Sequence, residues 1–260
     1  MDAYGGPFRG GGIMMAGTGV ETLAQPGGAG GTGRDGRLAG VAQAQGRVGR
    51  RQARGDIARE RCLALVNASH PLRARPMLQL ADVGNSARLD AQAAGPARRM
   101  LEACRAAGLD PKVTSGYRGR LEQAYLLARK TLSLMARGRS PWRAFELARR
   151  FVALPGTSEH ELGLAIDVCS ERGELRAHAE VQAWLAEHGW RFGFIRRYPA
   201  EKSQVTGIAC EPWHFRYVGL DAARAMQATG QCLEEFLDAA GSGCQTANPL
   251  ATSEHWKCRS

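Results

Sequence analysis

Two pairs of residues in this 260-residue chain combine histidine with a carboxylate, as metal sites and acid–base catalysts do. His160 is followed seven residues later by Asp167, and Glu211 is followed three residues later by His214. A catalytic zinc ion needs three imidazole or carboxylate ligands, an open position for water, and a nearby carboxylate that does not bind the metal. Two histidines, one aspartate and one further glutamate match that list.

Each pair alone has an ordinary explanation. A histidine seven residues from an aspartate arises often by chance, and a histidine beside Trp213 is usually packed in a core. Pro212 lies between Glu211 and His214 and disfavours an ordinary helix interior there. Together the pairs are more specific than either one, and we expect the four groups to converge.

The segments around the first pair predict how it is positioned. His160 lies in a glycine-containing loop, and Asp167 lies in the apolar, strand-like segment 164–168 that follows it. A turn at Leu162 and Gly163 would direct both side chains to one point.

A third motif, SGYR at 115–118, ends a predicted strand ahead of a predicted helix. Arg118 could hold an oxyanion or a substrate carboxylate by paired hydrogen bonds. The alternative is a surface arginine that pairs with a carboxylate.

Hydrophobic periodicity and turn signals predict strands scattered among helices, without regular βαβ spacing, which is typical of an α+β fold. Helices are expected at 96–108, 119–135, 178–188 and 221–239, and a further helix is expected to begin at Pro141. The apolar face of the helix at 119–135 contains Leu121, Tyr125, Ala128 and Leu132, and that of the helix from Pro141 contains Trp142, Phe145, Ala148 and Val152. Gly189 is the expected stop of the helix at 178–188. Strands are expected at 109–115, 164–168, 190–195 and 205–210.

Composition divides the chain into three parts. The first 55 residues hold 17 of the 33 glycines and no tryptophan, so residues 1–58 are predicted to be a Gly/Arg-rich disordered extension. We expect a single folded domain at 59–240 and a loose tail at 241–260. The net charge of +10 comes mostly from arginines that look scattered rather than striped, so no nucleic-acid partner is expected. No apolar run is long enough for a transmembrane segment.

The three motifs and two further segments carry a resemblance to a known family. SGYR with Gln123 downstream, SEHELGLAID (158–167) and GIACEPWHFRYVG (207–219) resemble the VanY-type D-alanyl-D-alanine carboxypeptidases, which are grouped with lysostaphin and the D-Ala-D-Ala dipeptidases. LVNASHPL (65–72) and FIRRYPAEKSQVTG (194–207) match too. The resemblance implies an α+β fold with a small antiparallel sheet that carries a zinc site and is flanked by helices.

The resemblance also implies the role of each matching residue. One Zn²⁺ per chain would be bound by the three metal ligands, with a glutamate as general base and an arginine as electrophilic helper. The implied metal ligands are His160, Asp167 and His214, the base is Glu211 and the helper is Arg118. Ser158 and Gln123 would help to hold the peptide, and Ser115 and Tyr198 are weaker candidates for substrate binding. For these four residues a loop cap, a helix-surface position or a packing role is an equal alternative.

The reaction that the resemblance implies is removal of the terminal D-Ala from peptidoglycan stem peptides or precursors. The alternatives are a D-Ala-D-Ala dipeptidase and a phage-type peptidoglycan endopeptidase with the same zinc site. A serine enzyme is excluded because no lysine has a serine three residues before it and no KTG occurs. A binding protein that has lost catalysis is disfavoured because Glu211 is present.

Two features depart from the family. Its cell-wall enzymes ordinarily carry a signal peptide or membrane anchor, and the amino terminus offers no clear signal, so the periplasm and the cytoplasm both stay open. Cys169 and Cys210 flank the proposed ligands, so they are either a disulfide near the metal or two buried thiols, which thiol titration before and after reduction would distinguish.

Overall fold

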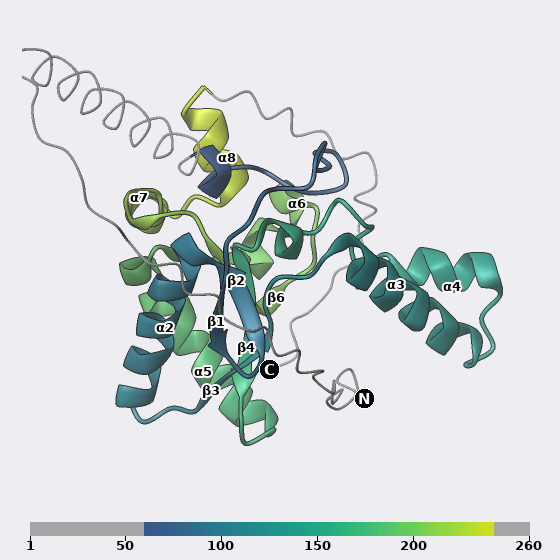
Figure 1. Cartoon of the computed structure of the whole chain (residues 1–260), viewed down its shortest axis with the longest axis horizontal. Coiled ribbons are helices and arrows are strands. Elements are labelled where there is room, and N and C mark those ends of the chain that lie inside the picture. Colours follow the sequence, from purple (N-terminus) through teal and green to yellow (C-terminus); the bar gives the residue numbers. More distant parts are fainter. Residues whose placement is uncertain (1–59, 242–260) are drawn as a thin grey trace, which may run out of the picture. The chain divides into compact units, whose positions relative to one another are not determined.

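The structure is a computed structural model and describes residues 60–241 (Figure 1). The predicted extension (1–58) and nearly all of the predicted tail (241–260) lie outside this range, so those two boundaries stay predictions. Within residues 60–241, no helix combines the length and the apolar character needed to cross a membrane.

A four-stranded sheet forms the centre of the fold (Figure 1). Its strands lie in the order β3 (Pro111–Ser115), β4 (Ala165–Ser170), β6 (Glu211–Tyr217) and β5 (Phe194–Tyr198), and all neighbours are antiparallel. A separate antiparallel hairpin pairs β1 (Leu80–Gly84) with β2 (Ala87–Asp90). Helices surround these sheets, which confirms the predicted α+β class with a small antiparallel sheet.

The core packs against one face of the four-stranded sheet. Ile166 and Val168 of β4 are fully buried and belong to one cluster with side chains of the long helices α2 (Ala91–Ala106) and α5 (Leu175–His188). Because successive strand residues point to opposite faces, Asp167 between them points to the other face. The strand therefore supplies the core with one face and the predicted metal site with the other.

The remaining elements connect and flank this core. They are α3 (Arg120–Met135), α4 (Pro141–Ala148), the 3₁₀ turn η1 (Glu159–Leu162), the 3₁₀ turn η2 (Gly189–Phe192), η3 (Ala200–Lys202), α6 (Ser203–Thr206), α7 (Leu220–Thr229) and α8 (Leu233–Ala239). A second, smaller cluster of buried residues joins the last two helices through Ala223, Met226, Leu233 and Leu237.

The helix expected at 96–108 begins five residues earlier. Its N-cap is Asp90, whose side chain accepts a hydrogen bond from the backbone N–H of Gln92, so Pro96 lies inside the helix rather than at its first position. The buried residues Ala93 and Ala94 lie in the extra turn. Capping by the aspartate and burial of the first turn outweigh the preference of proline for a helix start.

Three further expectations in the second half were wrong. Residues 205–210 are not a strand, because the helix α6 and a turn occupy them and the strand begins at Glu211. The helix expected at 221–239 is two helices, interrupted at Gly230, whose φ of +67° lies in the left-handed region that ends helices. The strand expected at 190–195 begins only at Phe194, because the 3₁₀ turn η2 (Gly189–Phe192) follows the helix that ends, as predicted, at His188.

The hairpin of α3 and α4 has less burial than the sequence pattern indicates. The expected helix at 119–135 is present, yet its buried residues are Gln123 and Leu127, and its apolar stripe faces solvent. In α4, Pro141 is the first residue, as predicted, but the helix ends at Ala148 before reaching Val152. Figure 1 shows the pair projecting from the side of the domain.

Candidate metal centre

A single cross-strand row brings together residues far apart in the sequence. Ser115 on β3 lies opposite Asp167 on β4, and Asp167 lies opposite His214 on β6. Side chains directly opposite each other in an antiparallel pair have Cβ atoms roughly 5 Å apart. The register of the sheet therefore places the two predicted ligands Asp167 and His214 side by side.

His160 joins this pair from the 3₁₀ turn η1. The Nε2 atom of His160 lies 3.3 Å from Oδ2 of Asp167, and Nδ1 of His214 lies 3.0 Å from Oδ1 of the same carboxylate. One ligand atom from each of the three residues lies within 4.8 Å of the other two. The convergence expected from the sequence is present.

Hydrogen bonds fix the orientation of both imidazole rings. Nδ1 of His160 lies 2.7 Å from the carbonyl oxygen of Gly116 and donates to it, because a carbonyl can only accept. Nε2 of His214 lies 3.2 Å from Oε2 of Glu159 and donates to that carboxylate. Each ring therefore presents its other nitrogen to Asp167. Metal-binding histidines are typically held in this way by a second acceptor.

Glycine at position 116 is required by the closeness of the neighbouring chain. A Cβ atom there would lie 2.5 Å from the carbonyl oxygen of Arg88, a contact that side chains do not make. The same carbonyl accepts a 2.6 Å hydrogen bond from the N–H of Tyr117. The glycine of SGYR thus lets β2 pack against the segment whose carbonyl orients His160.

Glu211 stands beside the three potential ligands at the start of β6. Its Oε2 lies 3.9 Å from Nδ1 of His214, and its side chain keeps a quarter of its surface exposed. Burial raises the pKa of Glu211 to about 7, and His214 opposes this rise. A carboxyl group that can hold or release a proton near neutral pH is suited to general base chemistry.

Arg118 approaches the same carboxylate from the end of SGYR. Its Nη1 donates to Oγ of Ser115 at 3.0 Å and lies 3.8 Å from Oδ2 of Asp167, while its backbone N–H donates to the carbonyl of His160. Burial lowers the pKa of Arg118, and Asp167 opposes that effect. The Nε atom is buried and has no hydrogen-bond partner within residues 60–241. Arg118 therefore keeps one buried N–H without an acceptor in the described part of the chain, while Ser115 holds its Nη1.

The other predicted substrate residues are also buried. Tyr198 lies opposite Glu211 in the sheet, and its ring lies 5.1 Å from that of His214, so it packs against a predicted ligand. Gln123 donates from Nε2 to the carbonyl of Ala153, and its buried Oε1 has no partner within the described part of the chain. Ser158 is buried at the N-cap of η1, two residues before His160.

Sequence reasoning missed the charged residues that support His214. Oε1 of Glu159 accepts a 2.8 Å hydrogen bond from Nε of Arg197 and lies 3.0 Å from Nη1 of Arg216. Arg197 also forms a two-pronged contact of 2.8 and 2.6 Å with Glu234 of α8. Both arginines are fully buried. Arginines inside the apolar strand segments FIRRY and HFRY could have signalled such a network, because buried charges require partners.

Arg216 connects the network to the start of the described chain. Its Nη2 donates to the carbonyl oxygens of Cys62 and Ala64, both at 3.0 Å, and lies 3.4 Å from that of Arg61. One guanidinium thus binds the segment before β1 and the carboxylate that orients His214.

The electrostatics of the cluster favour a cation at its centre. Burial alone would raise the pKa of Asp167, but His160 and His214 hold it well below its ordinary value. Burial likewise acts against charge on Glu159, and Arg197 and Arg216 outweigh it, so the pKa of Glu159 is lowered. Burial would lower the pKa of His214, yet hydrogen bonds with these two carboxylates raise it to about 9. Positive charge is therefore stabilised beside both carboxylates.

These residues fit a zinc ion. The donor set is two imidazole nitrogens and one carboxylate, both rings have their outer nitrogens bound to acceptors, and Glu211 stands beside them as a fourth group. Catalytic zinc sites use three such protein ligands and keep one position open. His160, Asp167 and His214 are the residues that could hold the metal.

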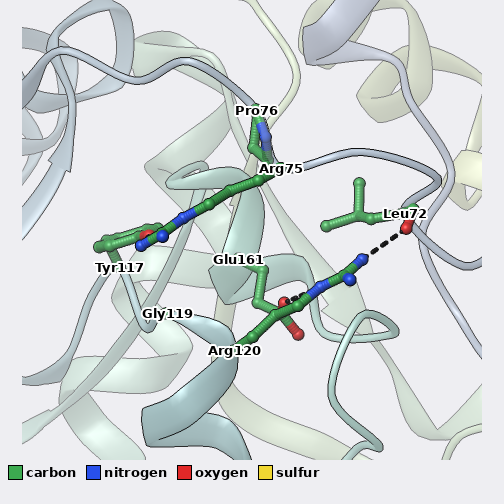
Figure 2. A pocket seen from close by; sticks show the side chains of 7 residues that line it. All are labelled: Leu72, Arg75, Pro76, Tyr117, Gly119, Arg120 and Glu161. Carbon is green, nitrogen blue, oxygen red and sulfur yellow. Dashed lines mark hydrogen bonds and ion pairs between the residues drawn. The ribbon is translucent and has the colours of Figure 1, made fainter.

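A small pocket lies between Tyr117 of SGYR and Glu161 of η1, and its other lining residues are Leu72, Arg75, Pro76, Gly119 and Arg120 (Figure 2). Arg120 lies between two partners there: it donates to the Leu72 carbonyl at 2.6 Å and approaches Glu161 at 3.5 Å. Glu161 in turn accepts a 2.6 Å hydrogen bond from the N–H of Gly156. These contacts fasten the turn that carries His160 to the start of α3.

Comparisons with known proteins agree with this geometry. The sequence profile of the VanY family, described as D-alanyl-D-alanine carboxypeptidase, matches residues 86–220. A D-alanyl-D-alanine carboxypeptidase of Enterococcus faecalis is 42% identical over 176 residues, which are 68% of this chain and 65% of that protein. The chain thus spans slightly less than two thirds of the length of this relative. A bifunctional D-Ala-D-Ala dipeptidase and carboxypeptidase of Enterococcus gallinarum, VanXYC, is 37% identical, with 93% of its length covered.

Solved structures show the same relationship. A vancomycin-resistance D,D-pentapeptidase VanY variant in complex with Zn(II) aligns with a TM-score of 0.63 at 41% identity, over 68% of this chain and 99% of that one. VanYB in complex with D-alanine-D-alanine aligns with the same TM-score and identity over 97% of its chain.

Proposed function

This chain belongs to the VanY family of D-alanyl-D-alanine carboxypeptidases, and we propose that it is a zinc-dependent hydrolase that removes the terminal D-Ala from peptidoglycan stem peptides or their precursors. The observation that carries the proposal is the convergence of two oriented imidazoles and Asp167, with Glu211 beside them. We assign one zinc ion to each chain, and residues 59–240 as the catalytic domain.

Each proposed site residue has its own role in the hydrolysis. A bound zinc ion would supply Lewis acidity that lowers the pKa of a water molecule and polarises the scissile carbonyl. Glu211 takes a proton from the water as its oxygen attacks the carbonyl carbon. When the C–N bond breaks, Glu211 returns that proton to the amine of the departing D-Ala, so the base ends in its starting form.

Arg118 stabilises the negative charge that develops on the carbonyl oxygen. Its contact with Ser115 and the closeness of Asp167 hold the guanidinium at the row where the ligands meet, and its Nε has a hydrogen bond to give. Such preorganised donors act strongly because they need no rearrangement during the reaction. Ser158, Gln123 and Tyr198 are assigned to holding the peptide, with the buried Oε1 of Gln123 as an acceptor for a peptide N–H.

The test measures zinc content of the purified protein together with D-alanine release from a stem pentapeptide, with and without a chelator. We expect stoichiometric zinc, loss of D-alanine release on chelation, recovery with added zinc, and no inhibition by β-lactams, which need a serine nucleophile. Zinc without D-alanine release would overturn the carboxypeptidase assignment, and absence of zinc would overturn the metal assignment.

Two further substrates separate the alternatives. Hydrolysis of free D-Ala-D-Ala would add dipeptidase activity, as in the relative from Enterococcus gallinarum that is described as bifunctional. Cleavage inside the stem peptide without D-alanine release would instead indicate the endopeptidase.

A further inference from the structure

The outer face of the α3–α4 hairpin is apolar and covered by nothing within residues 60–241. Leu121, Tyr125, Ala128, Leu132 and Met135 recur at alternating steps of four and three residues, which places them on one side of α3. Leu132 is 63% exposed and Tyr125 is 60% exposed, whereas Gln123 and Leu127 on the opposite side are buried. We call this row the α3 stripe.

Trp142 adds an aromatic ring near the tip of the same hairpin. It lies in the first turn of α4, just after the 136–140 connection, and is 71% exposed. Contiguous exposed apolar side chains of this size are uncommon on a domain surface and usually mark an interaction site.

The hairpin also carries the excess positive charge of the domain. Between residues 120 and 150 there are eight Lys or Arg against Glu122 and Glu146, a net charge of +6. The rest of residues 56–260 has as many acidic as basic side chains. The basic residues are scattered in the sequence, but the positive charge that no acidic residue balances is concentrated on this one element.

Much of this charge is available to a partner. In the described part of the chain, no carboxylate lies within ion-pair distance of Arg137, Arg139 or Arg143. All three are exposed and lie at the tip or on the first turn of α4. The basic groups thus surround the tip where Met135 and Trp142 are also exposed.

We propose that the α3–α4 hairpin docks the enzyme onto an anionic lipid surface, with the α3 stripe and Trp142 inserted among the lipids and the tip arginines bound to their headgroups. Apolar and aromatic side chains flanked by Arg and Lys are the composition of elements that lie in a membrane interface. Each cation near such a surface adds attraction that salt weakens. This proposal is independent of the reaction assigned above.

Two other occupants fit less well. A second copy of this chain would bring two hairpins of charge +6 together, and like charges repel. A nucleic acid would use the arginines but would leave the aliphatic stripe in water, because backbone phosphates do not bury leucine or methionine. An anionic bilayer complements the charge and the apolar row at once.

The experiment measures sedimentation of the full-length zinc-loaded protein with vesicles. Vesicles of phosphatidylglycerol and phosphatidylcholine in equal parts are compared with vesicles of phosphatidylcholine alone. We expect binding to the first and little to the second. The double variant Leu132→Ser/Trp142→Ser and the double variant Arg137→Gln/Arg139→Gln should each bind at least about tenfold more weakly. The matched control is Met77→Ser/Leu175→Ser, which removes two apolar side chains outside the hairpin that are even more exposed than Leu132 and Trp142.

Fluorescence supplies a second measurement that does not depend on the strength of binding. Emission should move to shorter wavelength when anionic vesicles are added, and Trp142→Phe should abolish the shift while the protein still sediments with vesicles. Equal binding by hairpin and control variants would overturn the proposal. A second result would also overturn it. If the Leu132→Ser/Trp142→Ser variant changed from oligomer to monomer but still bound vesicles, the α3 stripe would be an interface with a second copy of the chain.

Discussion

Oε2 of Glu159 lies 3.2 Å from Nε2 of His214, so a residue next to one predicted ligand in the sequence orients the other ligand in space. The carboxylate is fixed by Arg197 and Arg216, which come from β5 and β6. The outer nitrogen of His214 is thereby committed to Glu159, and Nδ1 is left to face Asp167. The ligand set depends on this hidden carboxylate as well as on the residues of the motifs.

Replacement of this carboxylate tests its role. We expect Glu159→Gln to weaken zinc affinity about 10- to 100-fold, because the imidazole loses its charged acceptor. Chelator competition measures the affinity, and the nitrogen resonances of His214 report which ring nitrogen carries the proton. Glu161→Gln is the matched control, since Glu161 is buried in the same 3₁₀ turn but contacts Gly156 and Arg120 instead. Equal loss of zinc affinity in both variants would contradict the prediction.

Replacement of the proposed base should separate metal binding from turnover. In Glu211→Gln the three proposed ligands are intact, so zinc content should remain that of the parent. D-alanine release should fall by about 10²- to 10⁴-fold, because an amide cannot accept the proton of the attacking water. Zinc analysis and a D-alanine assay on the same preparation check both halves. Turnover close to that of the parent would refute the assigned base.

The same substitution should change stability in a way that depends on pH. Burial raises the pKa of Glu211 from 4.5 to about 7, so the folded metal-free protein holds a proton that the unfolded chain releases between these values. Stability of the metal-free parent is therefore lost as pH rises through this window. Glu211→Gln removes that loss and should stabilise the metal-free protein by about 3 kcal/mol above about pH 7, and by little below about pH 4.5.

Denaturant unfolding of both chelated proteins at about pH 5 and about pH 8 measures this difference. A gain of the same size at both pH values would mean that packing, and not ionisation, separates the two proteins.

The guanidinium of Arg118 has a geometric role that lysine cannot reproduce. Arg118→Lys keeps the positive charge but loses the planar set of donors that contacts Ser115 and leaves Nε available. We expect kcat to fall about 10²- to 10³-fold with nearly unchanged zinc content, as for loss of an oxyanion donor. Steady-state kinetics on the pentapeptide measures the change. A rise in KM alone would instead assign Arg118 to ground-state binding of the substrate.

The sequence predicted the residue types of the site and the strand that carries Asp167, but it placed the neighbouring strand at 205–210 instead of Glu211–Tyr217. Asp167 and His214 are adjacent because their segments are β-strands that pair, and the apolar pattern around Asp167 indicated such a strand. Glu159 was not recognised, because its role depends on two arginines that are distant in the sequence and buried only in the folded chain. A charged residue beside a ligand gives no local sign of its partners.

The fold likewise has parts that the sequence predicted and parts that it did not. The long helices were predicted from their regular apolar period, and the small antiparallel sheet from the family resemblance. The break at Gly230 and the turn at 205–210 were missed, since they depend on local backbone conformation. For α3 the period was interpreted correctly as helical, but periodicity alone does not say whether an apolar face meets a core or solvent. That distinction needed the three-dimensional contacts.

The positions of the hydrogen-bond partners of Arg197 and Arg216 determine how much of the chain is needed for a stable folded unit. The family match ends at residue 220, yet Arg197 is neutralised in part by Glu234 on α8, and Arg216 binds carbonyls at residues 61, 62 and 64. A fragment cut at the limits of the match would keep every ligand and the base. It would leave two interior cations short of partners, and a cation deprived of its partner inside a protein is strongly destabilising. The smallest autonomous form of this protein is therefore longer than the segment that the family profile matches.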